Sequence, residues 1–453
     1  MDKRETFGSR FAVIMAMAGS AIGLGNIWRF PYVVGENGGS AFIIIYLIST
    51  LLLSLPIFLS EAVIGRKTGK GTFGAMEQLA PGTRWKWLGL LTVVSPLIIL
   101  SFYSVVGGWS VEYLLKSLTG SVSTGDAADS SAAFGRFISS VRAPLLCHTL
   151  FLGFCAVIVT AGVKKGIERF STVTMPVLFV LILLIMTYSL FLPGSGAGVT
   201  WMLKPDFSKL TASGVASAMG QSFFSLSLGV GTILTYSSYV RKDESLMASA
   251  LGTAAFDLLF ALIAGFAVMP AVFAAGIEPA AGPGLVFETL PYIFASMGSA
   301  APVLSAVVSL LFFLAILVAA VSSAISMLEV GVAYLVDEKG FSRGKAVAVL
   351  FAGCWILGTL CSLSFGPLAE FKIFGETFFS FCDKLTSNFL MAFGGLLFTF
   401  FVGWRMDREQ VRRELTSDGK DRFGTLCFKT VWFLIRYVAP AAIIVIFLTN
   451  LFL

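Results

Sequence analysis

Long apolar runs recur along this chain of 453 residues, and they constrain its fold more than any other feature. A helix needs about 20 mainly apolar residues to cross the hydrocarbon of a bilayer. The chain is 57% hydrophobic and only 13% charged, far from the composition of soluble domains. We therefore predict an all-α integral membrane protein with eleven transmembrane helices. They lie near residues 10–34, 39–64, 86–118, 144–162, 168–192, 214–239, 246–276, 301–336, 343–362, 373–403 and 428–452.

Clusters of Lys and Arg between the apolar runs indicate the orientation. The stretches "GRKTGK", "KKGIER", "VRKDE", "DEKGFSRGK" and "WRMDREQVRRE" alternate with "GSVSTGDAADSSAAFG" and "GIEPAAGPG". Because basic loops stay in the cytoplasm, we predict a multi-pass protein of the cell (inner) membrane with its N-terminus inside and its C-terminus outside. The basic residues form no single face, which argues against nucleic-acid binding. One histidine and no C-x-x-C pair argue against zinc or haem chemistry.

The first and sixth apolar runs contain residues that are unusual in a membrane helix. The stretch "GSAIGLGNIWRF" includes Gly25, Asn26 and Arg29, and "GQSFFSLSLGVG" places small polar residues beside Gly229. Close helix packing is the commoner reason for a single glycine, but matched interruptions in two halves point to an inverted-repeat transporter. Broken helices expose carbonyl oxygens to a cation and amides to a carboxylate. We predict a 5+5 repeat whose helices 1 and 6 are unwound at mid-membrane, with the binding site at the breaks.

The same reasoning divides the chain into four parts. Residues 1–192 form the first repeat, with helices 1–5, and residues 214–403 form the second, with helices 6–10. Residues 404–427 are a cytoplasmic linker, and residues 428–453 form helix 11. The function is therefore expected within the membrane part.

Four stretches carry a resemblance to a known family. "GSAIGLGNIWRFPYVVGENGGSAF", "SFFSLSLGVG", "SYVRKD" and "VSSAISM" resemble the neurotransmitter:sodium symporters, specifically their bacterial amino-acid transporters of the leucine-transporter type, the multi-hydrophobic amino-acid transporters included. The resemblance implies a symporter and not an enzyme. It implies import of aliphatic and aromatic L-amino acids by alternating access, with about two sodium ions per substrate and without chloride.

The resemblance also assigns two sodium sites, and for the first of them the chemistry agrees because every donor is a hard oxygen atom. The first site uses the carbonyl of Ala21, the side chains of Asn26, Ser225 and Asp257, and the carboxylate of the substrate. Asp257 stands where chloride-dependent relatives carry Asn, and Ala261 lacks a serine hydroxyl for the anion. A fixed carboxylate is therefore expected in place of chloride, the alternative being a protonated Asp257. The second site, which rests on the resemblance, uses Gly19, Ile22, Ala319, Ser322 and Ser323; the alternative is that the two serine hydroxyls bond to carbonyls of their own helix.

The substrate is expected between the two breaks, with its carboxylate near the amides of Gly23 and Gly25. Gly23 occupies the position where monoamine carriers of the family place an acid, so we expect an amino-acid substrate. Val230 replaces a bulkier aromatic residue of leucine-selective relatives, which widens an apolar pocket. The complete predicted substrate site is Ala21, Gly23, Gly25, Ile99, Tyr103, Phe224, Ser225, Ser227, Val230, Ser323 and Met327.

Charges at membrane depth need partners, and the resemblance pairs them as gates. Arg29 and Asp383 would close the outer side, and Arg4 and Asp337 the inner side; snorkelling to the nearest interface is the alternative. An ion channel lined by the same breaks, or a sodium-coupled carrier for another small zwitterion, is the alternative function. We expect a monomer or weak dimer in the bilayer.

Overall fold

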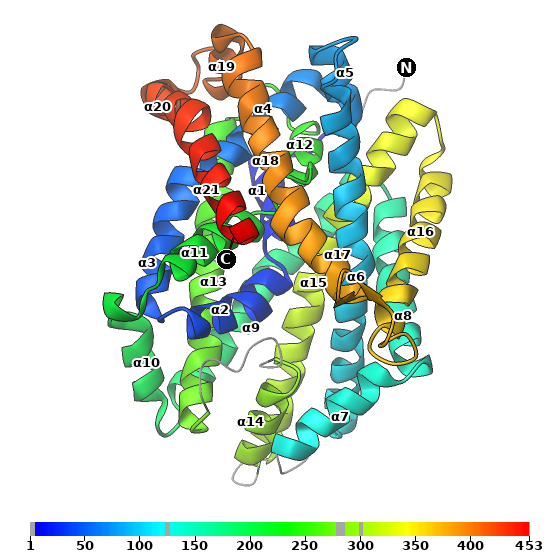
Figure 1. Cartoon of the computed structure of the whole chain (residues 1–453), viewed down its shortest axis with the longest axis vertical. Helices are drawn as coiled ribbons and strands as arrows, with labels where there is room; N and C mark the ends of the chain where they lie inside the picture. The colour runs from blue at the N-terminus through cyan, green and yellow to red at the C-terminus, as the bar shows by residue number, and fades with distance from the viewer. Residues whose placement is uncertain (1–4, 123–126, 278–285, 299–301, 453) are drawn as a thin grey trace.

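The computed structural model describes residues 5–122, 127–277, 286–298 and 302–452 (Figure 1). Among them, nine helical segments are long and apolar enough to cross a membrane. Several of these segments contain a short π-helical stretch, labelled η. They are α3 (Ser40–Ser49), η2 (Thr50–Ser54) and α4 (Leu55–Thr68); α6 (Lys86–Thr119); α8 (Arg142–Thr160); η3 (Val163–Glu168) and α9 (Arg169–Leu190); α13 (Leu246–Ala274); α15 (Pro302–Lys339); α16 (Arg343–Leu363); α17 (Phe378–Lys384), η6 (Leu385–Leu390), α18 (Met391–Phe400) and η7 (Phe401–Arg405); and α20 (Arg422–Phe433), η8 (Leu434–Val438) and α21 (Ala439–Phe452).

The two remaining predicted spans are broken. In the first, α1 (Arg10–Ala21) is followed by η1 (Gly25–Arg29) and α2 (Phe30–Glu36), and the two parts are bent by 54°. In the sixth, α11 (Ala212–Ser225) and α12 (Thr232–Ser237) are separated by six non-helical residues. The bent first pair raises the number of apolar spans in the described residues to ten, and the sixth run supplies two shorter helices. Both interruptions lie in the two apolar runs for which the glycines led us to predict a broken helix.

The remaining elements cover the two ends of the bundle. In Figure 1, α5 and α19 lie at the end where the N-terminus is drawn, and α7, α10 and α14 lie at the opposite end. A two-stranded antiparallel hairpin, β1 with β2, joins α16 to α17. These elements are α5 (Thr72–Leu79), α7 (Ala127–Ser139), α10 (Ser195–Leu203), η4 (Phe207–Lys209), α14 (Thr289–Gly298), β1 (Lys372–Ile373), β2 (Glu376–Thr377) and α19 (Arg408–Leu415).

The broken helices lie inside the bundle and the continuous ones surround them. Helix α1 packs against α9, α13 and α15, and α12 packs against α4 and α15. Helices α8, α9 and α16 turn large apolar side chains outward, among them Val157, Leu184 and Ile356. A surface of this kind suits hydrocarbon, while the irregular backbone, which hydrocarbon does not tolerate, is enclosed by protein.

Candidate functional site

The break in the first span is built from an extended residue and two glycines. Ile22, which follows α1, has φ −74° and ψ 107°, so the helical hydrogen-bond pattern stops there. The amide of Gly23 donates to Oδ1 of Asn26 at 3.3 Å. A Cβ atom on Gly23 would lie only 2.4 Å from the hydroxyl oxygen of Ser323 and 2.8 Å from that of Tyr103. The position therefore has no room for a side chain, least of all an acidic one.

The break in the sixth span depends on left-handed backbone conformations. Ser227, Gly229 and Gly231 have φ values of 52°, 79° and 73°, which glycine adopts freely and other residues rarely. Oε1 of Glu61, a fully buried residue of α4, accepts a hydrogen bond from the Gly229 amide at 2.7 Å. Glu61, which belongs to a neighbouring helix, thus stabilises the backbone of the unwound segment. Glu61 was not among the predicted site residues, although a single acid within the apolar run "LPIFLSEAVIG" was a signal that could have indicated it.

Four polar side chains meet beside the two breaks, and we call them the first oxygen cluster: Asn26, Tyr46, Ser225 and Asp257. Nδ2 of Asn26 donates to Oδ1 of Asp257 at 2.8 Å and to Oγ of Ser225 at 3.2 Å. The Ser225 hydroxyl donates to Oδ2 of Asp257 at 2.8 Å, and the Tyr46 hydroxyl lies 3.2 Å from Oγ of Ser225. Three of the four residues predicted for the first sodium site are therefore in mutual contact. The fourth, Ala21, lines the adjoining cavity.

The first oxygen cluster contains one carboxyl group and no basic side chain among its four members. Asp257 and Asn26 are completely buried, and no Lys, Arg or His side chain of the described residues forms an ion pair with Asp257. A buried carboxylate without a cation is costly. Oxygen donors around one negative charge fit a hard monovalent cation, which would restore neutrality. Tyr46 was not predicted, because a tyrosine in an apolar helix usually indicates packing.

A second group of oxygen atoms lies between α1 and α15. The Ser322 hydroxyl donates to the carbonyls of Ile22 at 3.3 Å and Ala319 at 2.8 Å. The Ser323 hydroxyl is 3.4 Å from the carbonyl of Gly19 and 3.3 Å from that of Ile22. All five residues predicted for the second sodium site are thus brought together from segments about 300 positions apart. We call this group the second oxygen cluster.

A small space, the central cavity, lies beside both clusters and has a volume of about 40 Å³. All eleven residues predicted for the substrate site line it, and Met391 of α18 is the one further lining residue. The Tyr103 hydroxyl accepts a hydrogen bond from the Leu24 amide at 3.2 Å. The Ser227 hydroxyl donates to the carbonyl of Ser20 at 2.9 Å, which connects the two breaks. A volume of this size holds about three water molecules. A ligand with a large side chain would therefore require the flexible walls of the cavity to move.

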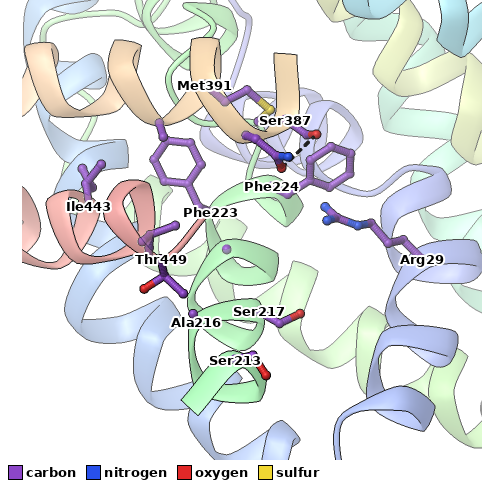
Figure 2. A pocket seen from close by; sticks show the side chains of 14 residues that line it. Arg29, Ser213, Ala216, Ser217, Phe223, Phe224, Ser387, Met391, Ile443 and Thr449 are labelled. Carbon is purple, nitrogen blue, oxygen red and sulfur yellow. Dashed lines mark hydrogen bonds between the residues drawn. The ribbon is translucent and has the colours of Figure 1, made fainter. Parts of the chain in front are cut away.

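Phe224 separates the central cavity from two others. It also lines a cavity of 60 Å³, here the gate cavity, and one of 330 Å³ between α11, α18 and α21. Figure 2 shows the larger one, with Arg29 directed at the ring of Phe224. The guanidinium carbon lies 4.5 Å from the centre of that ring, a distance typical of cation–π attraction. Arg29 therefore holds Phe224 over the central cavity.

The two predicted gate pairs are Arg29 with Asp383 and Arg4 with Asp337. Arg29 and Asp383 both line the gate cavity, but the ion pairs formed by the described residues do not include them. The guanidinium of Arg29 is placed over the ring of Phe224, and closure of the outer side by Arg29 and Asp383 stays a prediction. Arg4 lies outside the described residues. Oδ2 of Asp337 accepts a hydrogen bond from the Gly71 amide at 3.3 Å.

A buried ion pair that sequence analysis missed lies near the N-terminal end of the bundle. The hydroxyl of Tyr239 donates to Oε1 of Glu329 at 2.7 Å, and the guanidinium of Arg343 pairs with the same carboxylate. Arg343 also donates through Nε to the carbonyl of Val159 at 2.6 Å. The amide of Phe7 bonds the carbonyl of Tyr239 at 3.0 Å. This network connects the segment before α1 with α8, α15 and α16.

Comparison with known proteins identifies the family. The model of the sodium:neurotransmitter symporter family matches residues 4–133 and 135–453. The chain belongs to this family. The symporter is 37% identical over 447 residues to an uncharacterized sodium-dependent transporter, YhdH, of Bacillus subtilis, covering 99% of this chain and 98% of the relative. It is 34% identical over 462 residues to another from Haemophilus influenzae, covering 99% of each.

A solved structure also resembles the symporter closely. MhsT in complex with L-phenylalanine superimposes with a TM-score of 0.90 at 41% identity, covering 99% of this chain and 100% of that one. The predictions of a leucine-transporter-type fold, a membrane location and a transporter rather than an enzyme are confirmed. Sodium dependence is a property of the family.

Proposed function

We propose that this symporter imports hydrophobic L-amino acids together with about two sodium ions and without chloride. The observation that carries the proposal is the central cavity, which lies between the two breaks and adjoins both oxygen clusters. A substrate carboxylate in this cavity would lie beside the first oxygen cluster. The ion and the substrate would then share ligands, which is the physical requirement for coupling.

The charge at Asp257 supports sodium binding without chloride. Its carboxylate is buried between Asn26 and Ser225 and supplies the negative charge that would otherwise have to come from an anion. Uptake by the native protein is therefore expected to be independent of chloride. The second oxygen cluster, which has no carboxylate among its five members, would bind its ion through neutral oxygen donors.

The walls of the central cavity support a substrate with a large apolar side chain. Ile99, Val230, Met327 and Met391 line it, so a charged side chain would lose its hydration without finding a partner. The two methionines are flexible and can repack around different shapes. The similar protein MhsT was solved with L-phenylalanine, and this chain is proposed to accept aliphatic and aromatic amino acids alike.

The proposal also covers the membrane in which the protein lies and the side of that membrane on which each terminus is found. The basic stretches, including that of α19, would face the cytoplasm under the positive-inside rule. The N-terminus would then be inside and the C-terminus outside the cell (inner) membrane. The two repeats, residues 1–192 and 214–403, would together surround the site and open it alternately to the two sides. Residues 404–427 would be a cytoplasmic linker, helix 11 an appended span, and a monomer or weak dimer the unit.

A thermal-shift screen of the twenty amino acids in sodium and in potassium buffer tests this proposal. A bound ligand raises the melting temperature according to its concentration and affinity. Leucine, isoleucine, phenylalanine and tryptophan should stabilise the protein in sodium only, and aspartate and lysine in neither buffer. Stabilisation that is equal in both buffers, or a preference for glycine over leucine, would contradict it.

A further inference from the structure

A concave surface at the start of α6 is not used by the proposed transport mechanism. It has a volume of 590 Å³ and lies between the turn before α6, α6 itself and α18. We call it the Trp groove. Its lining residues are Thr83, Arg84, Trp85, Trp87, Leu88, Leu91, Phe393 and Leu397.

The Trp groove is polar at one end and apolar along its length. Thr83 and Arg84 occupy the turn, and Leu91 lies five residues beyond Lys86, the first residue of α6, which is about 8 Å at 1.5 Å per residue. Phe393 is 47% exposed and Trp87 61% exposed, so the apolar part opens toward the surroundings of the bundle. Trp85 packs its ring edge against Phe401, with ring centres 5.0 Å apart, which fixes that wall.

Arg84 is a cation without a partner in the described part of the chain. It is exposed, and no hydrogen bond or ion pair joins its guanidinium to a described residue. The Thr83 hydroxyl donates to the carbonyl of Ala80 at 2.7 Å and accepts from the Trp85 amide at 3.4 Å. These bonds shape the turn that carries Arg84. A guanidinium presents a planar fork of donors that suits phosphate oxygens.

We propose that the Trp groove binds one anionic glycerophospholipid, with the headgroup phosphate on Arg84 and an acyl chain along Leu91, Phe393 and Leu397. The groove is cationic at one end and apolar along its length, as a lipid has a charged headgroup at one end and an apolar acyl chain. The tryptophans favour the headgroup level of a bilayer, and the apolar walls continue toward the hydrocarbon. A second exposed cation, Lys86, lies two residues from Arg84 and adds to the attraction for negative charge. The proposal is independent of the transported substrate.

Native mass spectrometry of the purified full-length protein tests the proposal, with phosphatidylglycerol and phosphatidylcholine of identical acyl chains as probes. The native protein should retain phosphatidylglycerol in preference. Arg84→Ala should weaken that binding about fivefold, since one basic residue near the membrane surface contributes about 1 kcal/mol, and should weaken phosphatidylcholine less, because the choline cation offsets the charge of its phosphate. Lys420→Ala is the matched control, because Lys420 is exposed and does not line the groove.

A second variant tests the apolar part separately. Leu91→Trp should obstruct the apolar part of the groove and weaken both lipids while Arg84 is retained. Melting temperatures close to native would establish that each variant is folded. Equal binding of the two lipids by the native protein, or equal losses for Arg84→Ala and Lys420→Ala, would overturn the proposal. A dimer that Leu91→Trp dissociates would also overturn it, since a second copy would then occupy the groove.

Discussion

Replacing Asp257 with asparagine removes the buried charge of the first oxygen cluster and preserves the size of the side chain. The carboxylate oxygens lie 2.8 Å from Nδ2 of Asn26 and 2.8 Å from Oγ of Ser225. A sodium ion held by these two side chains would therefore lie within about 4 Å of the charge, given ordinary ion–oxygen distances. No cation of the described residues pairs with Asp257, so the ion would be its main source of neutralisation.

The size of the effect follows from Coulomb's law. Opposite unit charges 4 Å apart attract by about 4 kcal/mol at an effective dielectric constant of about 20. Since 1.4 kcal/mol is a factor of ten in a binding constant, Asp257→Asn should weaken sodium binding at the first site by about 10³-fold in the absence of chloride. A chloride ion that entered beside the new amide would restore part of this loss.

Uptake of labelled leucine into proteoliposomes, in chloride and in gluconate buffer, measures this effect. The native protein should transport equally in both buffers, and Asp257→Asn should transport measurably only in chloride and at higher sodium concentration. Asp243→Asn is a control, because Asp243 lies at an exposed position away from both oxygen clusters. A chloride requirement in the native protein, or full transport by Asp257→Asn without chloride, would refute the reasoning.

Three further substitutions test other parts of the site. Asn26→Ala should weaken sodium and substrate binding together, because Asn26 would contact both; sodium titrations of substrate binding measure this, and an unchanged sodium dependence would sink the assignment. Val230→Phe should reduce tryptophan and phenylalanine binding far more than leucine binding, since it narrows the central cavity; competition against one labelled substrate measures the ratio, and equal losses for all substrates would count against the pocket. Arg343→Ala should destabilise the protein by about 3–5 kcal/mol, because it leaves the buried carboxylate of Glu329 without its cation; a melting temperature equal to that of native protein would rule this out.

The broken helices were predictable from the sequence because they violate a strong physical rule. Hydrocarbon does not tolerate unpaired backbone groups, so glycines beside Asn26 in one run and beside Ser225 in another predicted irregular backbone enclosed by protein. The structure places Gly229 at a positive φ of 79°. The sets of residues around the cavity and the clusters came from the family resemblance, which records contacts that no single sequence displays.

Other features could not be predicted, because they depend on how separate helices pack against one another. Tyr46 and Glu61 occupy apolar helices, and their contacts with Ser225 and Gly229 are separated by 179 and 168 positions in the chain. The Glu329–Arg343 pair bridges two helices whose relative rotation the sequence does not reveal. For Arg29, the sequence indicates that a charge at membrane depth needs a partner, but a carboxylate and an aromatic face both meet that need.

Sodium-driven accumulation of leucine in proteoliposomes is the most direct test of coupled transport at the broken helices. With a tenfold inward sodium gradient and no membrane potential, each coupled ion supplies about 1.4 kcal/mol. Two ions should therefore raise internal leucine about 100-fold over external leucine, and an ionophore that collapses the gradient should abolish the accumulation. Leucine that only equilibrates across the membrane, at the same rate in sodium and in potassium, would contradict the account.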